Sequence, residues 1–158
     1  MLHSMAKELI TASRTINASP AQVWAVASDL KGMGERSPQC KKMLVLGGEP
    51  GTGTTTINLN KRGPLFWPTL SKVTQWTPNE LLEWRIPLNR SHWRYELTDN
   101  GDGTTTLTES RIVKGNTSAL SRGLVAAFLG GNDTFEAEME QGIAQTLAAI
   151  AATAEPAR

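Results

Sequence analysis

The sequence predicts an α+β fold in which a curved antiparallel sheet of about six to seven strands packs around one long C-terminal helix. In residues 133–154, apolar side chains recur every three or four positions, the spacing of one helix face. These positions are Phe135, Met139, Ile143, Leu147 and Ile150. Between residues 40 and 113, the chain consists almost entirely of short strand-like segments separated by turns. A helix of ~22 residues is ~33 Å long, so its apolar face needs a partner surface as long as such a sheet.

Length and composition limit the possible classes of protein. The chain has 158 residues, of which 39% are hydrophobic, enough for one domain with a hydrophobic core. We therefore expect a single domain over residues 1–158, with residues 1–6 and 155–158 poorly ordered. A formal net charge of +1 provides no electrostatic basis for binding nucleic acid.

Cysteine content and hydropathy bear on location. Cys40 is the only cysteine, so no intrachain disulfide can form. This is typical of a reducing compartment and predicts a cytoplasmic location. No run approaches the ~20 apolar residues of a membrane helix, so stable membrane insertion is not expected.

The first part of the chain predicts one strand followed by one or two short helices. Residues 7–18 contain Leu9, Ile10 and Ile16 among several Thr and Ser, and predict a strand. Ser19 is a good N-cap residue and Pro20 suits the first helical position, so a helix should begin there. Glycines and a proline interrupt residues 29–38, which leaves room for a second short helix at most.

The middle of the chain predicts consecutive strands bounded by turn residues. The predicted strands are 41–46, 53–61, 67–76, 81–88, 91–98 and 104–114. The strongest hairpin turn is Asn100-Gly101-Asp102-Gly103. Strands joined by such short turns form an antiparallel meander. Asp133 followed by Glu136 then predicts a capping box at the start of the long helix.

The segment before the long helix has two interpretations. Residues 119–129 form a shorter helical pattern that ends at Gly130-Gly131. The glycine pair would allow this segment to act as a mobile lid over a pocket, with Phe128 as a ligand contact. Alternatively, it is a fixed short helix that completes the core.

Several local strings resemble one protein family. They are ASPAQVW at residues 18–24, ERSPQC at 35–40, RGP at 62–64 with Trp67, WRYEL at 93–97 and GTTTLTES at 103–110. The order of elements and these strings are similar to the START-like superfamily, in particular its bacterial polyketide cyclase/dehydrase-like branch. The resemblance covers about residues 7–153 and implies a helix-grip fold. Where that branch usually has Trp, this chain has Arg36, which changes one candidate pocket residue.

Strand parity identifies Glu109 and Arg111 as candidate catalytic residues. Alternate residues of a strand face opposite sides, so both side chains share a face with Leu107 and Val113. If the apolar residues face the helix, the two charged residues do so as well. They are then polar anchors in an apolar pocket. Alternatively, they form a partly buried ion pair at the sheet edge, or a bulge turns them outward.

Aromatic residues are the candidate pocket wall. Trp67, Trp84 and Trp93, together with Tyr95, would provide flat apolar surface for a ligand, although plain core packing is an equal alternative. Trp24 is expected in the core and Trp76 at the rim or surface. The helical residues Phe135, Met139 and Ile143 would face the sheet and close the pocket from the other side.

The parity of the strand at 53–61 is ambiguous. Ile57 and Leu59 argue for one inward face, whereas the resemblance implies that Asn58 and Asn60 point inward. We favour the second arrangement, which leaves Ile57 and Leu59 outside, where they could form an oligomer contact. A monomer or a homodimer is therefore expected.

Other catalytic signals are weak. His3 and His92 are the only histidines, and parity directs His92 to solvent, so no metal site is expected. Nothing in the sequence predicts a cofactor. Cys40 would be a nucleophile only beside a base.

Three functions remain open. The first is a binder of a small hydrophobic or aromatic ligand, such as a lipid or a polyketide-like molecule. The second is an enzyme of the cyclase/dehydratase type, in which Glu35, Glu109 or Arg111 supplies acid–base or oxyanion help. The third is a START-like module that binds a protein partner and whose pocket is filled by side chains.

Overall fold

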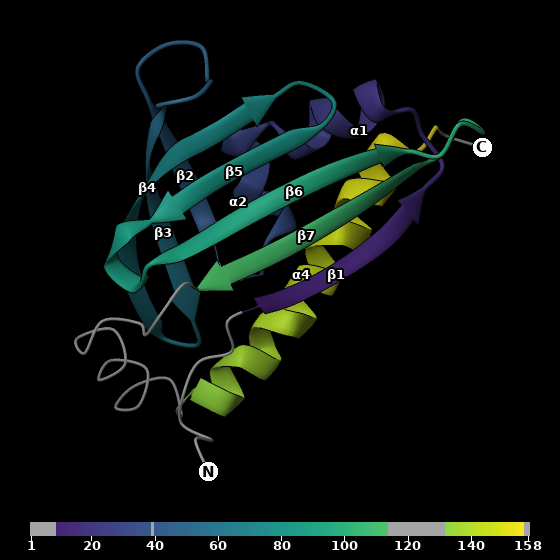
Figure 1. Ribbon diagram of the computed structural model, residues 1–158. Helices are drawn as coiled ribbons and strands as arrows, with labels where there is room; N and C mark the ends of the chain where they lie inside the picture. The colour runs from purple at the N-terminus through teal and green to yellow at the C-terminus, as the bar shows by residue number, and fades with distance from the viewer. Residues whose placement is uncertain (1–8, 39, 114–131, 157–158) are drawn as a thin grey trace.

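A seven-stranded antiparallel sheet forms one layer of the computed structural model, and a long helix packs on its concave side (Figure 1). The structure describes residues 9–38, 40–113 and 132–156. The strand order is β1-β7-β6-β5-β4-β3-β2, so only β1 is placed out of sequence, beside the last strand. This arrangement confirms the predicted α+β helix-grip fold.

The strands correspond closely to the predicted segments. They are β1 (Leu9–Ile16), β2 (Cys40–Leu46), β3 (Thr55–Arg62), β4 (Leu65–Thr77), β5 (Leu81–Ile86), β6 (Ser91–Asp99) and β7 (Thr105–Val113). The strand predicted at 81–88 ends two residues early. Pro87 has no N–H for the strand ladder and starts a short 3-10 helix, η2 (Pro87–Asn89).

Short helices follow the first strand, as predicted. α1 (Pro20–Ala27) begins with a capping box, in which the Ser19 hydroxyl accepts from the Gln22 N–H and the Gln22 side chain accepts from the Ser19 N–H. A 3-10 turn, η1 (Leu30–Gly32), leads into the single turn α2 (Met33–Arg36). These two short elements pack against β2.

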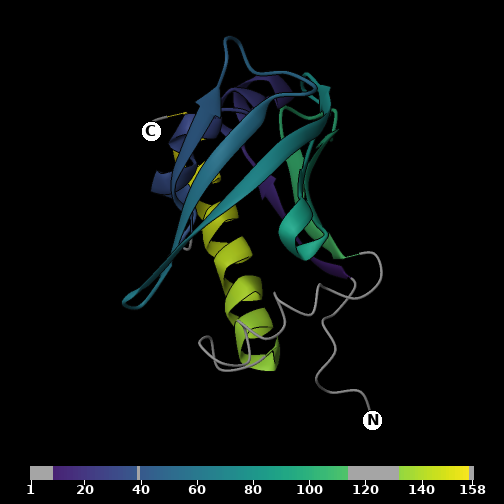
Figure 2. The same ribbon diagram turned by 90° about the vertical axis from the view of Figure 1, so that its left-hand side faces the viewer.

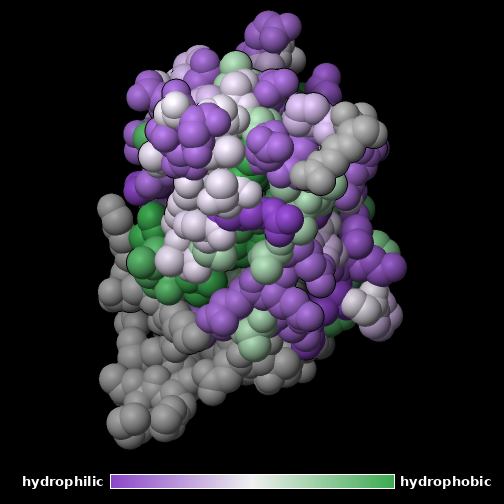
Figure 3. All heavy atoms as spheres, turned by 90° about the vertical axis from the view of Figure 1, so that its right-hand side faces the viewer, coloured by the Kyte–Doolittle hydropathy of each residue, from purple (hydrophilic) through white to green (hydrophobic). Residues whose placement is uncertain are grey.

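The long helix α4 (Asn132–Ala154) lies within the curve of the sheet (Figure 2). Met139, Ile143, Leu147 and Ile150 are buried against the sheet, as their spacing predicts. Seen from the right-hand side of Figure 1, the coloured surface is mainly hydrophilic to neutral, with a hydrophobic area beside the grey atoms (Figure 3). Within the described residues, no helix combines the length and apolarity needed to cross a bilayer.

Two predictions for the C-terminal region have different outcomes. The predicted cap at Asp133 is wrong, because the helix already includes Asn132 and Asp133 therefore lies within its first turn. The proposed lid at 119–129, with Phe128, lies outside the described residues. The same is true of the side chain of Phe135, although its backbone belongs to α4.

Candidate functional site

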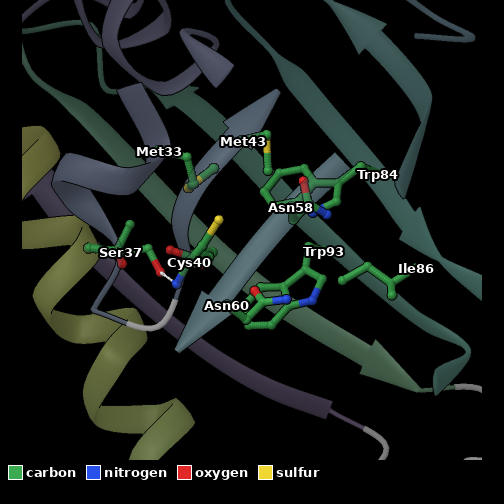
Figure 4. Close-up of a pocket in the computed structure, with 11 residues that line it drawn as sticks. Met33, Ser37, Cys40, Met43, Asn58, Asn60, Trp84, Ile86 and Trp93 are labelled. Atoms are coloured by element: carbon green, nitrogen blue, oxygen red, sulfur yellow. Dashed lines mark hydrogen bonds between the residues drawn. The ribbon is translucent and has the colours of Figure 1, made fainter. Parts of the chain in front are cut away.

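A small cavity of about 70 Å³ lies between the concave face of the sheet and α4 (Figure 4). Its lining residues belong to α2, five strands (β2, β3, β5, β6 and β7) and α4, with Ser37 in the turn after α2. A smaller chamber of about 30 Å³ adjoins it and shares four of its lining residues. These shared residues are Ser37, Trp93, Glu109 and Thr146.

Trp84 and Trp93 form the aromatic wall of this cavity. They are direct neighbours across β5 and β6, and their rings stack with centroids 6.4 Å apart and planes 9° from parallel. Tyr95, the next inward residue of β6, packs against Trp84 at 5.4 Å and is fully buried behind the wall. Burial raises the pKa of Tyr95 well above its ordinary value, and the nearby Glu109 adds to this.

A polar strip faces the aromatic wall from β3. Asn58 and Asn60 both line the cavity, and their amides donate to the hydroxyl of Thr69 at 3.2 and 3.0 Å. Ile57 and Leu59 are exposed on the opposite face. The structure therefore confirms the inward face that the resemblance implied for this strand.

Glu109 is the carboxyl group among the residues that line this cavity. Its side chain is 3% exposed, and its Oε1 has no hydrogen-bond partner among the described residues. Burial raises the pKa of Glu109 from 4.5 to about 8, against the opposing effect of the Arg36 cation. At neutral pH the carboxyl group is therefore mainly the neutral acid.

Arg111 points inward as predicted, but its partner is not Glu109. Its guanidinium lies 3.5 Å from the carboxylate of Glu136 on α4, and both side chains are buried. Burial lowers the pKa of Arg111, while Glu136 opposes that effect. The alternative of an ion pair at the sheet edge is wrong, since β7 lies between β1 and β6.

Of the adjacent residues on α2, Arg36 is buried and Glu35 is exposed. Neither Glu35 nor Arg111 lines the cavity or the smaller chamber, so of the three predicted catalytic residues Glu109 alone lies on its wall. The Arg36 guanidinium donates to the Asp29 carbonyl at 3.0 Å, and its Nε has no partner among the described residues. Arg36, which stands where the resembling proteins usually have Trp, is thus the residue of this pair that is buried.

Of three other predicted ligand contacts, two line the smaller chamber and one lies outside both chambers. Met139 and Ile143 line the smaller chamber from α4. Trp67 is half-buried on β4 and does not line either chamber. Trp76 is also half-buried and packs edge-on against Trp24 at a centroid distance of 5.3 Å.

Sequence reasoning missed several lining residues. Met33, Met43 and Ser37 approach the cavity from α2, β2 and the turn between them. Thr146 is a polar residue on the apolar face of α4, three positions after Ile143, and this irregularity was the available signal. Its hydroxyl donates to the Gly142 carbonyl at 2.8 Å.

Neither the Cys40 thiol nor the His92 imidazole adds a reactive group to the cavity. Cys40 lines the cavity, but burial raises the pKa of its thiol, which disfavours the reactive thiolate. His92 lies on the outer face, as parity predicts, with Nδ1 3.7 Å from the Glu83 carboxylate. Among the described residues, no group of His, Cys, Asp and Glu is arranged to hold a metal ion.

Comparison with known proteins identifies the type of domain. A family described as "Polyketide cyclase / dehydrase and lipid transport" matches residues 7–155. No curated protein matches the chain.

Solved structures share the fold at low sequence identity. The Zhui aromatase/cyclase from Streptomyces sp. R1128 is 19% identical with a TM-score of 0.73, over 92% of each chain. The protein TTHA0849 from Thermus thermophilus is 15% identical with a TM-score of 0.69, over 92% of this chain and 96% of that one. The Polyketide_cyc-like protein Cgl2372 from Corynebacterium glutamicum is 26% identical with a TM-score of 0.58, over 90% of this chain and 88% of that one.

Proposed function

We propose, since the chain belongs to the polyketide cyclase/dehydrase and lipid transport family, that it binds a small hydrophobic or aromatic ligand between the sheet and α4. The observation that supports this is the cavity itself, which combines the stacked pair Trp84 and Trp93 with a few polar groups. An apolar pocket with a small number of oriented polar groups is the usual composition of a small-molecule site. A lipid-like or polyketide-like molecule fits this composition.

The size of the cavity places a condition on this function. Its volume of about 70 Å³, with about 30 Å³ in the adjoining chamber, holds only a few water molecules. Sites for drug-sized ligands usually have roughly 300–1,000 Å³. Binding therefore requires side chains to move, and the unbranched residues Met33, Met43 and Met139 are suited to this.

We expect ligand binding to change tryptophan fluorescence, because Trp84 and Trp93 would gain a stacked partner. The measurement is a titration with fatty acids, sterols and flat polycyclic compounds. A variant with Trp84→Phe and Trp93→Phe should lose most of the signal. Trp76→Phe, which alters a tryptophan packed on Trp24, is the matched control and should keep it. An equal signal in wild type and the double variant would place the ligand elsewhere.

A second candidate function is catalysis by a general acid, and the state of Glu109 favours it. A buried neutral carboxyl group can donate a proton to a carbonyl or a leaving hydroxyl, as cyclisation or dehydration requires. Glu109→Gln keeps the size of the side chain and removes the acid. For a polyketide-like substrate that wild type turns over, the rate should fall ~100-fold or more while binding stays nearly intact. Unchanged turnover would leave the binder as the function.

The oligomeric state and location belong to the same proposal. Exposed Leu44, Ile57 and Leu70 lie side by side on the outer face of β2, β3 and β4. Such a patch is compatible with the expected monomer or homodimer. The single cysteine supports a cytoplasmic location.

A further inference from the structure

The convex outer side of the sheet is apolar over β2, β3 and β4. The structure describes eight exposed large hydrophobic residues, and six of them lie on this side of these three strands. The six residues are Leu44, Leu46, Ile57, Leu59, Phe66 and Leu70. We call this surface the outer apolar face. It covers the half of the sheet farthest from β1 (Figure 1), and it lies opposite the cavity, because the cavity residues Met43 and Asn58 alternate with these side chains.

Strand pairing brings these side chains together in adjacent rows. Leu44, Ile57 and Leu70 are direct partners across the three strands and form the central row. In the next row, Leu59 pairs with Pro68. Side chains two positions apart on a strand share a face, so the rows form one continuous surface. Single exposed leucines are ordinary, whereas a continuous apolar surface usually marks a contact site.

The rest of the outer side is polar. On β5 and β6 it carries Glu83 and Arg94, joined at 2.6 Å. Between β7 and β1, hydroxyl groups pair across the strands, as in Ser13 with Thr108 at 2.7 Å. A sheet with one face in water normally has polar residues on that face. The apolar composition therefore belongs to β2, β3 and β4 and needs its own explanation.

Lysines border the outer apolar face, and its three strands contain no Asp or Glu. Lys42 and Lys72 are exposed at its margins. Lys61 lies over the Phe66 ring, with its Nζ 5.1 Å from the ring centroid. Glu49 follows in the loop after β2, outside the strands. The whole chain has a net charge of only +1, so this concentration of cations is local and favours an anionic partner.

The composition of the face favours a bilayer over another protein. Interfaces between proteins are enriched in Trp, Tyr and Arg and depleted in Lys. On the three strands, Arg62, Trp67 and Trp76 all turn to the concave side. Aliphatic side chains with lysines around them are typical of surfaces that lie at a lipid–water interface. A second copy of the chain would bring two sets of lysines together with no strand carboxylate between them.

We propose that the outer apolar face docks reversibly on a bilayer that contains anionic lipids, with Leu44, Ile57 and Leu70 at the centre of the contact. The lysines bind the headgroups, and their long stems let the neighbouring apolar side chains enter the acyl boundary. The protein stays at the surface, and no helix has to span the bilayer. This docking is independent of the cavity and its ligand, because the two lie on opposite sides of the sheet.

The first experiment is cosedimentation of the full chain with vesicles. One set contains phosphatidylcholine alone, and the other contains phosphatidylcholine and phosphatidylserine at a ratio of about two to one. At low salt, wild type should bind the anionic vesicles about 100-fold more strongly than the neutral ones. The preference should shrink as salt screens the lysines. Absence of binding to the anionic vesicles at low salt would overturn the proposal.

Two leucines provide a matched apolar comparison. Leu70 and Leu9 are both strand residues with 56% exposure, but Leu9 lies on β1 at the opposite edge of the sheet. Leu70→Thr should weaken binding to the anionic vesicles about fivefold or more, because less apolar surface leaves water. Leu9→Thr should leave binding unchanged. Threonine suits a strand, and thermal melting shows that both variants are folded. Equal losses in the two variants would place the contact elsewhere.

Charge removal supplies a second comparison. Lys42→Gln with Lys72→Gln should weaken binding to the anionic vesicles about thirtyfold. Arg14→Gln with Lys31→Gln removes the same charge from exposed positions on β1 and η1 and should have little effect. Equal losses would mean that the vesicles respond to net charge and not to this face, which overturns the proposal.

Sedimentation equilibrium without lipid tests the competing occupant. Wild type should be monomeric under the conditions of the vesicle experiment. A wild-type dimer that Leu70→Thr dissociates, together with absence of vesicle binding, would show that a second copy covers the outer apolar face and that the bilayer does not.

Discussion

At pH 7, Glu109→Gln is expected to raise the free energy of unfolding by about 3 kcal/mol, an unusual gain for a substitution at a candidate site. The reason is the cost of burying this acid. Its pKa is about 8 in the folded protein, against an ordinary value of 4.5, so folding at neutral pH must return a proton to the carboxyl group. Glutamine has nearly the same shape and no proton to recover.

The sign of the pH dependence follows from the raised pKa. Below pH 4.5 both the folded and unfolded states hold the proton, and Glu109 has no penalty. Between pH 4.5 and about 8 only the folded state holds it, so wild-type stability falls as pH rises, by about 5 kcal/mol in total. Above that range both states are ionised and the difference is constant.

Urea unfolding of wild type and Glu109→Gln at several pH values between 4 and 9 measures this effect. The two proteins should be similar near pH 4 and diverge up to pH 8. Glu35→Gln is the matched control, since Glu35 is exposed on α2 and its replacement should produce no such divergence. Parallel stability curves for wild type and Glu109→Gln would show that the Glu109 carboxylate is ionised or hydrated in the folded protein.

Arg111→Met is expected to lower the free energy of unfolding by about 3–5 kcal/mol. The substitution removes the cation that faces Glu136 at 3.5 Å, and both side chains are buried. Burial of the Glu136 carboxylate costs desolvation energy, and the substitution removes the attraction of the Arg111 cation that offsets part of this cost. The double variant Arg111→Met with Glu136→Leu should recover most of the loss, because it removes both charges together.

The pair Arg62 and Glu138 provides the comparison. It also joins the sheet to α4, but solvent reaches both side chains. Arg62→Met should therefore change stability much less than Arg111→Met, as solvent screens the lost attraction. Chemical denaturation of Arg62→Met, Arg111→Met and the double variant at one pH measures these losses of stability. An equal loss at positions 62 and 111 would mean that burial does not determine the strength of these contacts.

Local periodicity was sufficient to predict much of this protein. Met139 and Ile143 face the sheet because a helix of 3.6 residues per turn brings every third or fourth side chain to one side. Glu109 and Trp93 share the concave face because side chains of a strand alternate. Turn residues such as Asn100-Gly101 defined the strand boundaries to within a few residues. These properties depend on neighbours within about ten positions, so a single sequence contains them.

Only the tertiary structure decided which side chains meet. Parity placed Arg111 on the inner face, but its partner Glu136 lies 25 residues away on another element. Sequence could not show that the single turn α2 buries Arg36 and exposes Glu35. The cavity likewise combines Met33, Asn58 and Thr146 from three elements. Periodicity specifies the face on which a side chain lies, whereas partners and burial depend on the distances between segments that packing brings together.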